Sequence, residues 1–356
     1  MHGEKSLHLR PMQYERHDFV RFSSEAQRIQ ANLEQAYVAW VDAKRALEAM
    51  PTSMYWKTVN AVEYLAIKET SLSHGTTQGR RDAKTESRLT QHVEEKERLQ
   101  QRIRTLDAQV SERAGLYRRL RLPSILDRQA EILRRLDVEG LLGEDLMVVG
   151  TNAFIAYELA CGARFPTGNE ETEDFDMAWC RGSGASLAST QVGDQRKSLF
   201  ACLRSLDNSY TINPKKPYQA VNQDGYKVEL LAAPSTHPLP VSEAFEPMAT
   251  LVEQEWLLRG RPLNVVVATV RGRACPLYVP DPRWMALHKL WLNQKPERNP
   301  AKKAKDRRQG EVLLDAVHFF LEDTFPLDVD FLMELPNELR TFFDDWCASR
   351  HVIPKS

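Results

Sequence analysis

The pattern of apolar and polar positions divides the chain into a helical beginning, a mixed middle and a helical end. From Ser24 to about Met50, apolar residues recur at helical spacing, and Ser23 is a typical capping residue. Pro51 ends this predicted helix, and the pattern from Tyr55 to Thr70 predicts a second one.

A long charged helix is predicted after a polar connection over residues 73–81. It runs from about Lys84 to Tyr117, and its sparse apolar positions form a narrow seam. A narrow seam packs on one partner, as in a helical hairpin or coiled coil. Residues 1–120 therefore predict a helical N-terminal region with a charged helical hairpin.

The pattern after Pro123 predicts a mixed α/β core over residues 121–280. A predicted helix over 124–136 leads to a short apolar strand, a Gly-Thr-Asn turn and another helix over 153–160. Further strands are predicted at 175–179, 218–221, 226–231, 263–270 and 274–279. Residues 281–356 predict a helical C-terminal region, with helices at about 284–293, 301–322 and 329–347.

The overall charge excludes a protein that binds nucleic acid or membrane through bulk charge alone. The 356 residues contain 48 Lys plus Arg and 49 Asp plus Glu, so the formal charge is −1. No stretch is long and apolar enough to predict a membrane helix, and no secretory signal is apparent. The 5 cysteines are scattered without a CxxC pair, which favours a reducing, cytoplasmic setting over a disulfide framework.

The turn Gly150-Thr151-Asn152 is the first candidate feature for chemistry, because it joins a strand to a helix. Such a turn lets backbone N–H groups approach a phosphate closely, and the helix dipole favours the negative charge. A tight strand-to-helix turn with Thr151 or Asn152 as the N-cap explains the same residues without a ligand.

Three acids in the middle region are candidate metal ligands. Asp174 and Asp176 are two apart in a predicted strand, so both project from one face, and two adjacent carboxylates usually need a cation between them. Glu229 lies in an otherwise apolar strand, and with these aspartates it would complete an oxygen cage for two Mg²⁺ ions. Asp-x-Asp is also common in loops, and a Lys227–Glu229 pair on a solvated face is the alternative for the third acid.

This order of motifs resembles the DNA polymerase beta-like nucleotidyltransferase superfamily. More closely, the run from Leu146 to Trp179 is similar to a bacterial family of nucleotidyltransferase-fold proteins whose substrates are undefined. The similarity extends to Met54–Lys57 and Tyr64–Leu65 upstream and to His288–Leu290 downstream, and so over most of residues 50–320. The interval between Gly150 and Asp174 is longer than in compact members of the superfamily, which predicts a loop over 162–171.

The resemblance implies an α+β fold, in which a polymerase beta-like core of mixed sheet and flanking helices lies between the two helical regions. It implies that Gly150, Thr151 and Asn152 hold a triphosphate. It also implies that Asp174, Asp176 and Glu229 are catalytic metal ligands for two Mg²⁺ ions, with Mn²⁺ as an alternative.

A basic cluster in the C-terminal helices is the remaining candidate for nucleotide binding. Lys289, Arg298 and Lys305 are similar to a helical Lys, an Arg and a Lys-Asp pair that abut the triphosphate in related nucleotidyltransferases. Lysine supplies a point charge for phosphate, and arginine can bind it bidentately. A solvated helix face, with Asp306 bridging its neighbours, is the alternative.

The predicted function is metal-dependent transfer of an NMP from an NTP to an acceptor hydroxyl, with release of pyrophosphate. Basic flanks such as Arg80-Arg81 favour RNA, for example a tRNA end, as the acceptor, while a protein or a small molecule stays open. The alternative from another class is a non-catalytic RNA- or protein-binding module on the same fold.

Overall fold

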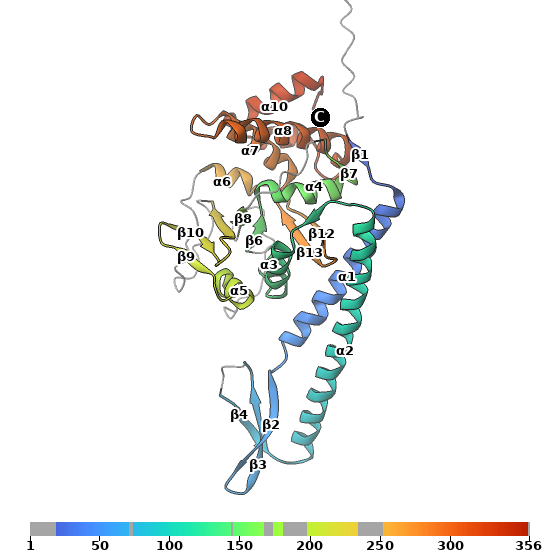
Figure 1. Cartoon of the computed structure of the whole chain (residues 1–356), viewed down its shortest axis with the longest axis vertical. Coiled ribbons are helices and arrows are strands. Elements are labelled where there is room, and N and C mark those ends of the chain that lie inside the picture. The colour runs from blue at the N-terminus through green and yellow to red at the C-terminus, as the bar shows by residue number, and fades with distance from the viewer. Residues whose placement is uncertain are drawn as a thin grey trace, which may run out of the picture. The chain divides into compact units, whose positions relative to one another are not determined.

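The structure is a computed structural model that describes residues 19–70, 74–143, 145–166, 174–180, 198–233 and 252–354 (Figure 1). The chain divides into two compact units, one of residues 23–159 and 169–281, the other of residues 1–22, 160–168 and 282–356. Helices together with mixed sheets confirm the predicted α+β class. The three-part division of the chain at 120 and 280 stays a prediction. None of the helices in the described ranges combines the length and the apolar character that a bilayer crossing requires.

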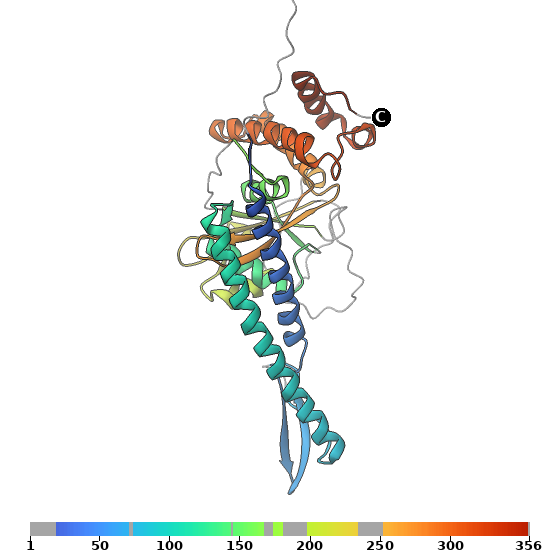
Figure 2. The same cartoon turned by 90° about the vertical axis from the view of Figure 1, so that its right-hand side faces the viewer.

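Two long helices of the first unit, α1 (Ser24–Glu48) and α2 (Ala83–Arg119), lie side by side (Figures 1 and 2). The Ser23 hydroxyl caps α1 by accepting a hydrogen bond from the backbone N–H of Ala26 at 3.2 Å. Asp82 begins α2 in a capping box with Thr85. Both helices were predicted, and their facing apolar positions are buried, including Leu33 and Trp40 of α1 and Leu99, Val110 and Tyr117 of α2.

The helix predicted from Tyr55 to Thr70 is wrong, because this segment forms two strands of an antiparallel sheet. The sheet has the order β2 (Ser53–Val59), β3 (Val62–Lys68) and β4 (Thr76–Arg80), so a strand also occupies part of the predicted polar connection. Between β2 and β3, Asn60 and Ala61 both have positive φ, at 50° and 60°. Two such residues make the tight hairpin turn that the pairing of β2 with β3 requires. The turn contains no glycine, so the sequence does not predict it.

A five-stranded mixed sheet forms the centre of the first unit, in the order β6-β8-β11-β10-β9. Its strands are β6 (Leu146–Val148), β8 (Asp174–Trp179), β9 (Thr211–Asn213), β10 (Lys216–Val221) and β11 (Lys227–Ala232). β8 and β11 are parallel, and the other neighbours are antiparallel. The strands predicted from alternating and apolar runs are therefore confirmed here.

The core of this sheet follows the alternation along its strands. Phe175 and Met177 of β8 and Val228 and Leu230 of β11 are fully buried. A second sheet of β13 (Ala274–Val279), β12 (Leu263–Thr269) and β5 (Ser124–Ile125) belongs to the same unit, as do the helices α3 (Asp127–Val138), α5 (Leu199–Leu206) and α6 (Val252–Leu257). One face of β8 and β11 is thus available for polar side chains.

The other unit is mostly helical, as predicted for the C-terminal region. It contains α7 (Pro282–Gln294), α8 (Pro300–Ala316) with a π-helical extension (Val317–Leu321), α9 (Val329–Glu334) and α10 (Asn337–Arg350). The single helix predicted over 329–347 is wrong, because Pro336 separates α9 from α10. The loop predicted over 162–171 includes the short strand β7 (Ala163–Arg164), which pairs with β1 (Val20–Arg21), and its residues 167–171 lie outside the described ranges.

Candidate active site

The central sheet brings two of the three predicted acids side by side. In the parallel pairing of β8 with β11, Asp176 is the register partner of Glu229. Neighbouring strands lie about 4.8 Å apart, and register partners project from the same face of a sheet. Both residues are half-buried, between fully buried neighbours in each strand. Two acidic side chains from adjacent parallel strands thus lie on the same face of the sheet.

The glycine turn lies directly against the first of these acids. Gly150 has φ of +70°, and a Cβ placed on it would come within 2.6 Å of the Asp176 Oδ2 atom. The backbone N–H of Val149 also donates to the Asp176 carbonyl at 3.0 Å. Gly150 begins a 3₁₀ helix (Gly150–Ala153) that continues as α4 (Phe154–Cys161). Glycine is required here for two reasons: the left-handed backbone and the absence of a side chain beside a carboxylate.

A row of side-chain amides holds the second acid in place. Gln219, in β10, is the register partner of Glu229 and donates from its Nε2 to the Glu229 Oε1 at 2.7 Å. Asn213, in β9, donates from its Nδ2 to the Gln219 Oε1 at 2.8 Å. Because Gln219 is only 5% exposed, this chain of hydrogen bonds fixes the direction of the carboxylate. The sequence analysis does not identify Gln219 as a site residue. The predicted hairpin around Gly225 could have indicated it, because its register places Gln219 opposite Glu229.

The rest of the glycine turn is tied to α3. Asn152 accepts a hydrogen bond on its Oδ1 from the Nε2 of the buried Gln129 at 3.3 Å. The 3₁₀ helix follows Val149, which makes no side-chain capping bond, so the alternative with Thr151 or Asn152 as the N-cap is not what the structure has. Near Gln129, burial raises the pKa of the Tyr226 phenol well above its usual range, so this group stays neutral.

Asp174 begins β8, and its Cα pairs with that of Lys227. Its part in a ligand set stays a prediction, since its side chain is not among those the structure describes. Among the side chains that are described, no three His, Cys, Asp or Glu residues gather into a group suited to a metal ion.

The predicted basic cluster is in the other unit, where two of its three members contact one buried acid. Lys289 of α7 donates from Nζ to the Asp306 Oδ1 at 2.9 Å, and Arg298 donates from Nε to the Asp306 Oδ2 at 2.8 Å. Lys289 is 5% exposed and Asp306 2% exposed. Asp306 thus bridges α8 to α7 and to the loop before α8, rather than to its sequence neighbours on a solvated face. Lys305 is half-exposed beside it in α8.

His288 lies next to Lys289 in α7 and is also buried. Burial, followed by the neighbouring Lys289 charge, lowers the pKa of this imidazole to about 3. It stacks on Trp291 with ring centroids 5.9 Å apart. His288 is therefore a neutral packing residue at physiological pH.

Comparison with known protein families matches residues 127–333, more than half of the chain, to a family described as nucleotidyltransferase. The matched range includes the glycine turn, the acids of β8 and β11 and the cluster around Asp306. No curated protein and no solved structure matches the chain.

Proposed function

The chain belongs to a nucleotidyltransferase family, and we propose that it moves an NMP from an NTP to an acceptor hydroxyl, with release of pyrophosphate. It is thus a transferase of phosphorus-containing groups. The observation that carries the proposal is the contact of Gly150 with Asp176, beside the register partner Glu229. Gly150 has no side chain, so the turn and the Asp176 carboxylate lie against each other, and a phosphate held by the turn would be close to a cation held by the acids.

We propose a polymerase beta-like core for residues 121–280. Three features support it: the Gly-Thr turn after β6, the acid pair Asp174 and Asp176 in the neighbouring strand β8, and the acid Glu229 in the next strand β11. This spatial order of strands agrees with the order of motifs in the resemblance drawn from the sequence.

The donor set suits a divalent cation such as Mg²⁺ or Mn²⁺. Hard cations prefer carboxylate oxygens, and Asp176 and Glu229 present them on one face of the sheet. We propose that these two residues, with Asp174, would hold the ions. When bound, the ions would supply charge neutralisation on the phosphates and would lower the pKa of the acceptor hydroxyl.

The chain itself supplies orientation. Gly150 and Thr151 would bind the triphosphate through backbone N–H groups, since Gly150 gives the turn a left-handed backbone at the start of the 3₁₀ helix. Gln219 would keep the Glu229 carboxylate aimed at the site through its 2.7 Å hydrogen bond. A carboxylate held in place before substrate binds costs little reorganisation during the reaction.

We propose RNA as the acceptor and the cytoplasm as the setting. The second proposal rests on the cysteines, all of which are free thiols. Nucleotide binding by Lys289, Arg298 and Lys305 stays a prediction. In the structure, Lys289 and Arg298 pair with the buried Asp306, and Lys305 precedes that residue in α8.

Thermal stabilisation by nucleotide tests the proposed function. Each NTP is added with and without Mg²⁺, and one of them is expected to raise the melting temperature only when the metal is present. Incubation with the same α-labelled NTP and total cellular RNA should then label RNA. The double variant Asp174→Ala with Asp176→Ala should lose both effects.

A matched control is Asp107→Ala with Asp224→Ala, which removes two exposed carboxylates of the same unit. This variant should keep the metal-dependent stabilisation. If wild type and the Asp174/Asp176 variant respond alike, or if no nucleotide is transferred with Mg²⁺ or Mn²⁺, the proposal fails.

A further inference from the structure

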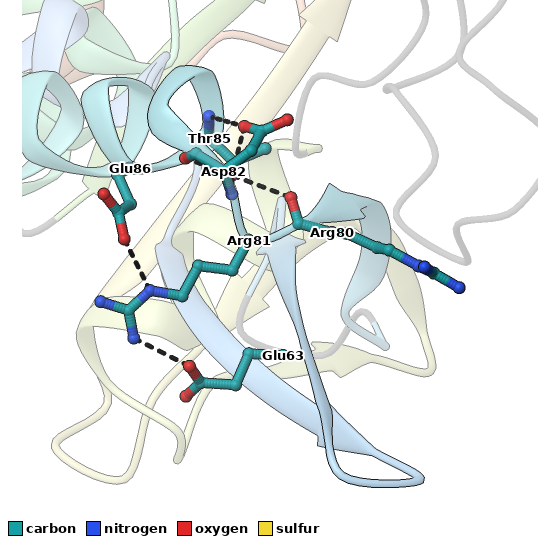
Figure 3. A network of polar contacts seen from close by, with 6 residues as sticks. All are labelled: Glu63, Arg80, Arg81, Asp82, Thr85 and Glu86. Carbon is teal, nitrogen blue, oxygen red and sulfur yellow. Dashed lines mark hydrogen bonds and ion pairs between the residues drawn. The ribbon is translucent and has the colours of Figure 1, made fainter.

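The sheet β2-β3-β4 has two faces of different character, and one of them packs towards α2. On this inner face, a Cβ on Gly79 would touch the Thr85 side chain of α2 at 3.5 Å. Arg81 lies 5.1 Å from the centre of the Trp56 ring and pairs with Glu63 of β3 and Glu86 of α2 (Figure 3). The charge of Arg81 is thus satisfied within the fold.

The opposite, outer face is set by the strand register. Lys57 of β2 pairs with Tyr64 of β3, which pairs in turn with Arg80 of β4. These three side chains therefore form one row across the sheet, with a tyrosine between two cations. Figure 3 shows the Arg80 side chain extending away from the cluster of Arg81, Glu63 and Glu86.

A second tyrosine forms a platform beside this row. Tyr55 pairs with Ala66, which pairs with Thr77. The Tyr55 hydroxyl reaches the residue before β4, because a Cβ on Gly75 would overlap it. Ala66 beneath is fully buried while Tyr55 is 40% exposed, so the ring lies across the sheet with part of its surface open to solvent.

The charge of the outer face is of one sign. Its described positions contain the cations Lys57, Lys68 and Arg80, with Lys57 and Arg80 exposed, and no carboxylate projects from this face in β2, β3 or β4. The acids of the same sheet and its connection to α2 are used elsewhere, Glu63 for Arg81 and Asp82 for capping α2. A cationic face with partly exposed tyrosine rings complements phosphates linked by unstacked bases.

We propose that this outer face binds single-stranded RNA, as a docking surface for the acceptor of the transfer reaction; the acceptor role rests on the proposed function. Lys57, Lys68 and Arg80 contact the phosphates, while Tyr55 and Tyr64 stack on bases. Duplex RNA fits less well, because its bases are stacked on one another and leave the tyrosine rings without partners.

Binding of a fluorescein-labelled oligouridine of about 12 nucleotides to the full chain tests the proposal by fluorescence anisotropy. The charge reversal Lys57→Glu with Arg80→Glu should raise the Kd about tenfold or more and make binding less dependent on salt. The control Arg102→Glu with Arg104→Glu changes two exposed arginines of α2 by the same charge. It should change the Kd by less than about threefold.

Stacking is tested separately at Tyr55. Tyr55→Leu should raise the Kd about tenfold with an unchanged salt dependence, and Tyr55→Phe should restore binding because the ring remains. The proposal is overturned if wild type does not bind the RNA, if both charge reversals weaken binding equally, or if duplex RNA binds as tightly as the single strand.

The same variants separate this proposal from the proposed function. Lys57→Glu with Arg80→Glu should keep the metal-dependent stabilisation by NTP, yet label RNA about tenfold more slowly. If RNA binds through this face but no NTP stabilises the protein, the docking surface stands and the transfer proposal fails. If NTP is used but RNA neither binds nor is labelled, the docking surface fails and the transfer proposal keeps a different acceptor.

Discussion

Two groups of charged residues predicted to serve the same reaction are built in opposite ways. In the central sheet, Asp176 and Glu229 are half-buried acids in adjacent strands, and Gly150 lies against the Asp176 carboxylate. In the C-terminal region, one acid, Asp306, is buried between two cations, Lys289 and Arg298. The first group gathers like charges, whereas the second group pairs opposite charges.

The difference sets the proposed ligand site apart from a structural contact. Adjacent carboxylates repel each other when both are ionised, and groups of like charge are common at functional sites. A buried acid with two cationic partners needs no further ligand to be satisfied. Gly310 of α8 supports the structural reading, because a Cβ there would lie 2.6 Å from Leu290 of α7, so the two helices are closely packed where the cluster forms.

The largest expected effect is on transfer activity in the sheet. Asp176→Asn with Glu229→Gln should lower the transfer rate by about a thousandfold or more, because the donor oxygens for the cation lose their charge. The free energy of unfolding should stay equal or rise, because repulsion between the acids is removed. Transfer of labelled nucleotide measures the rate, and urea unfolding measures the free energy of unfolding. A large loss of stability would put these acids in the same class as Asp306 and break the comparison.

The next effect is on stability in the helices. Asp306→Ala should lower the free energy of unfolding by about 3–5 kcal/mol, since it leaves Lys289 buried without its carboxylate partner. Glu311→Ala, which removes an exposed partner of Arg307 on the same helix, should cost less than about 1 kcal/mol. Equal losses of stability in chemical denaturation would show that the buried ion pairs of Asp306 stabilise the fold no more than the exposed pair of Glu311.

Gly150→Ala is expected to have a smaller effect that combines strain with displacement of a carboxylate. Gly140 is its control, since it has nearly the same φ, +71° against +70°, and open space where the Cβ would go. Both alanine variants should lose about 1–2 kcal/mol of stability from left-handed strain. Only Gly150→Ala should also slow transfer, by about a hundredfold, because Asp176 must move. Equal transfer rates in the two variants would separate the glycine turn from the acids.

The last expected effect is the pH dependence of stability through His288. Its pKa in the fold is about 3, lower than its ordinary value of 6.5, so below pH 6.5 the unfolded chain takes up a proton that the folded chain does not. As the pH is lowered below 6.5, this residue should therefore decrease the free energy of unfolding by up to about 1.4 kcal/mol per pH unit. His288→Phe keeps an aromatic ring beside Trp291 and should make the fall between pH 6 and pH 4 shallower. Parallel curves for the two proteins would contradict the effect of burial.

The sequence predicted the central sheet well and the N-terminal sheet wrongly, and the reason lies in the turns. Gly225 marks the β10–β11 hairpin, and alternation from Lys227 to Ala232 places Glu229 on the polar face. At Asn60-Ala61, by contrast, two residues other than glycine adopt positive φ. No glycine marks this position, so the apolar pattern around it predicts a helix instead. The pairing of β3 with both neighbours outweighs local propensity there.

The candidate site was predictable in its residue types and unpredictable in its supports. Gly150, Asp176 and Glu229 were named from motif order, and the structure brings them together. Gln219, which orients Glu229, became visible only through strand register, and the role of Asp306 as the centre of the basic cluster required the packing of α7 against α8.

The sequence by itself determined which face of each strand carries an acid and where glycine is needed, because side-chain alternation and backbone freedom are local properties. Only the tertiary structure decided that β8 runs parallel to β11 with Asp176 beside Glu229, and that Lys289 and Arg298 share a buried acid. Contacts between distant segments depend on how the whole chain buries its apolar surface, and no local pattern contains that information.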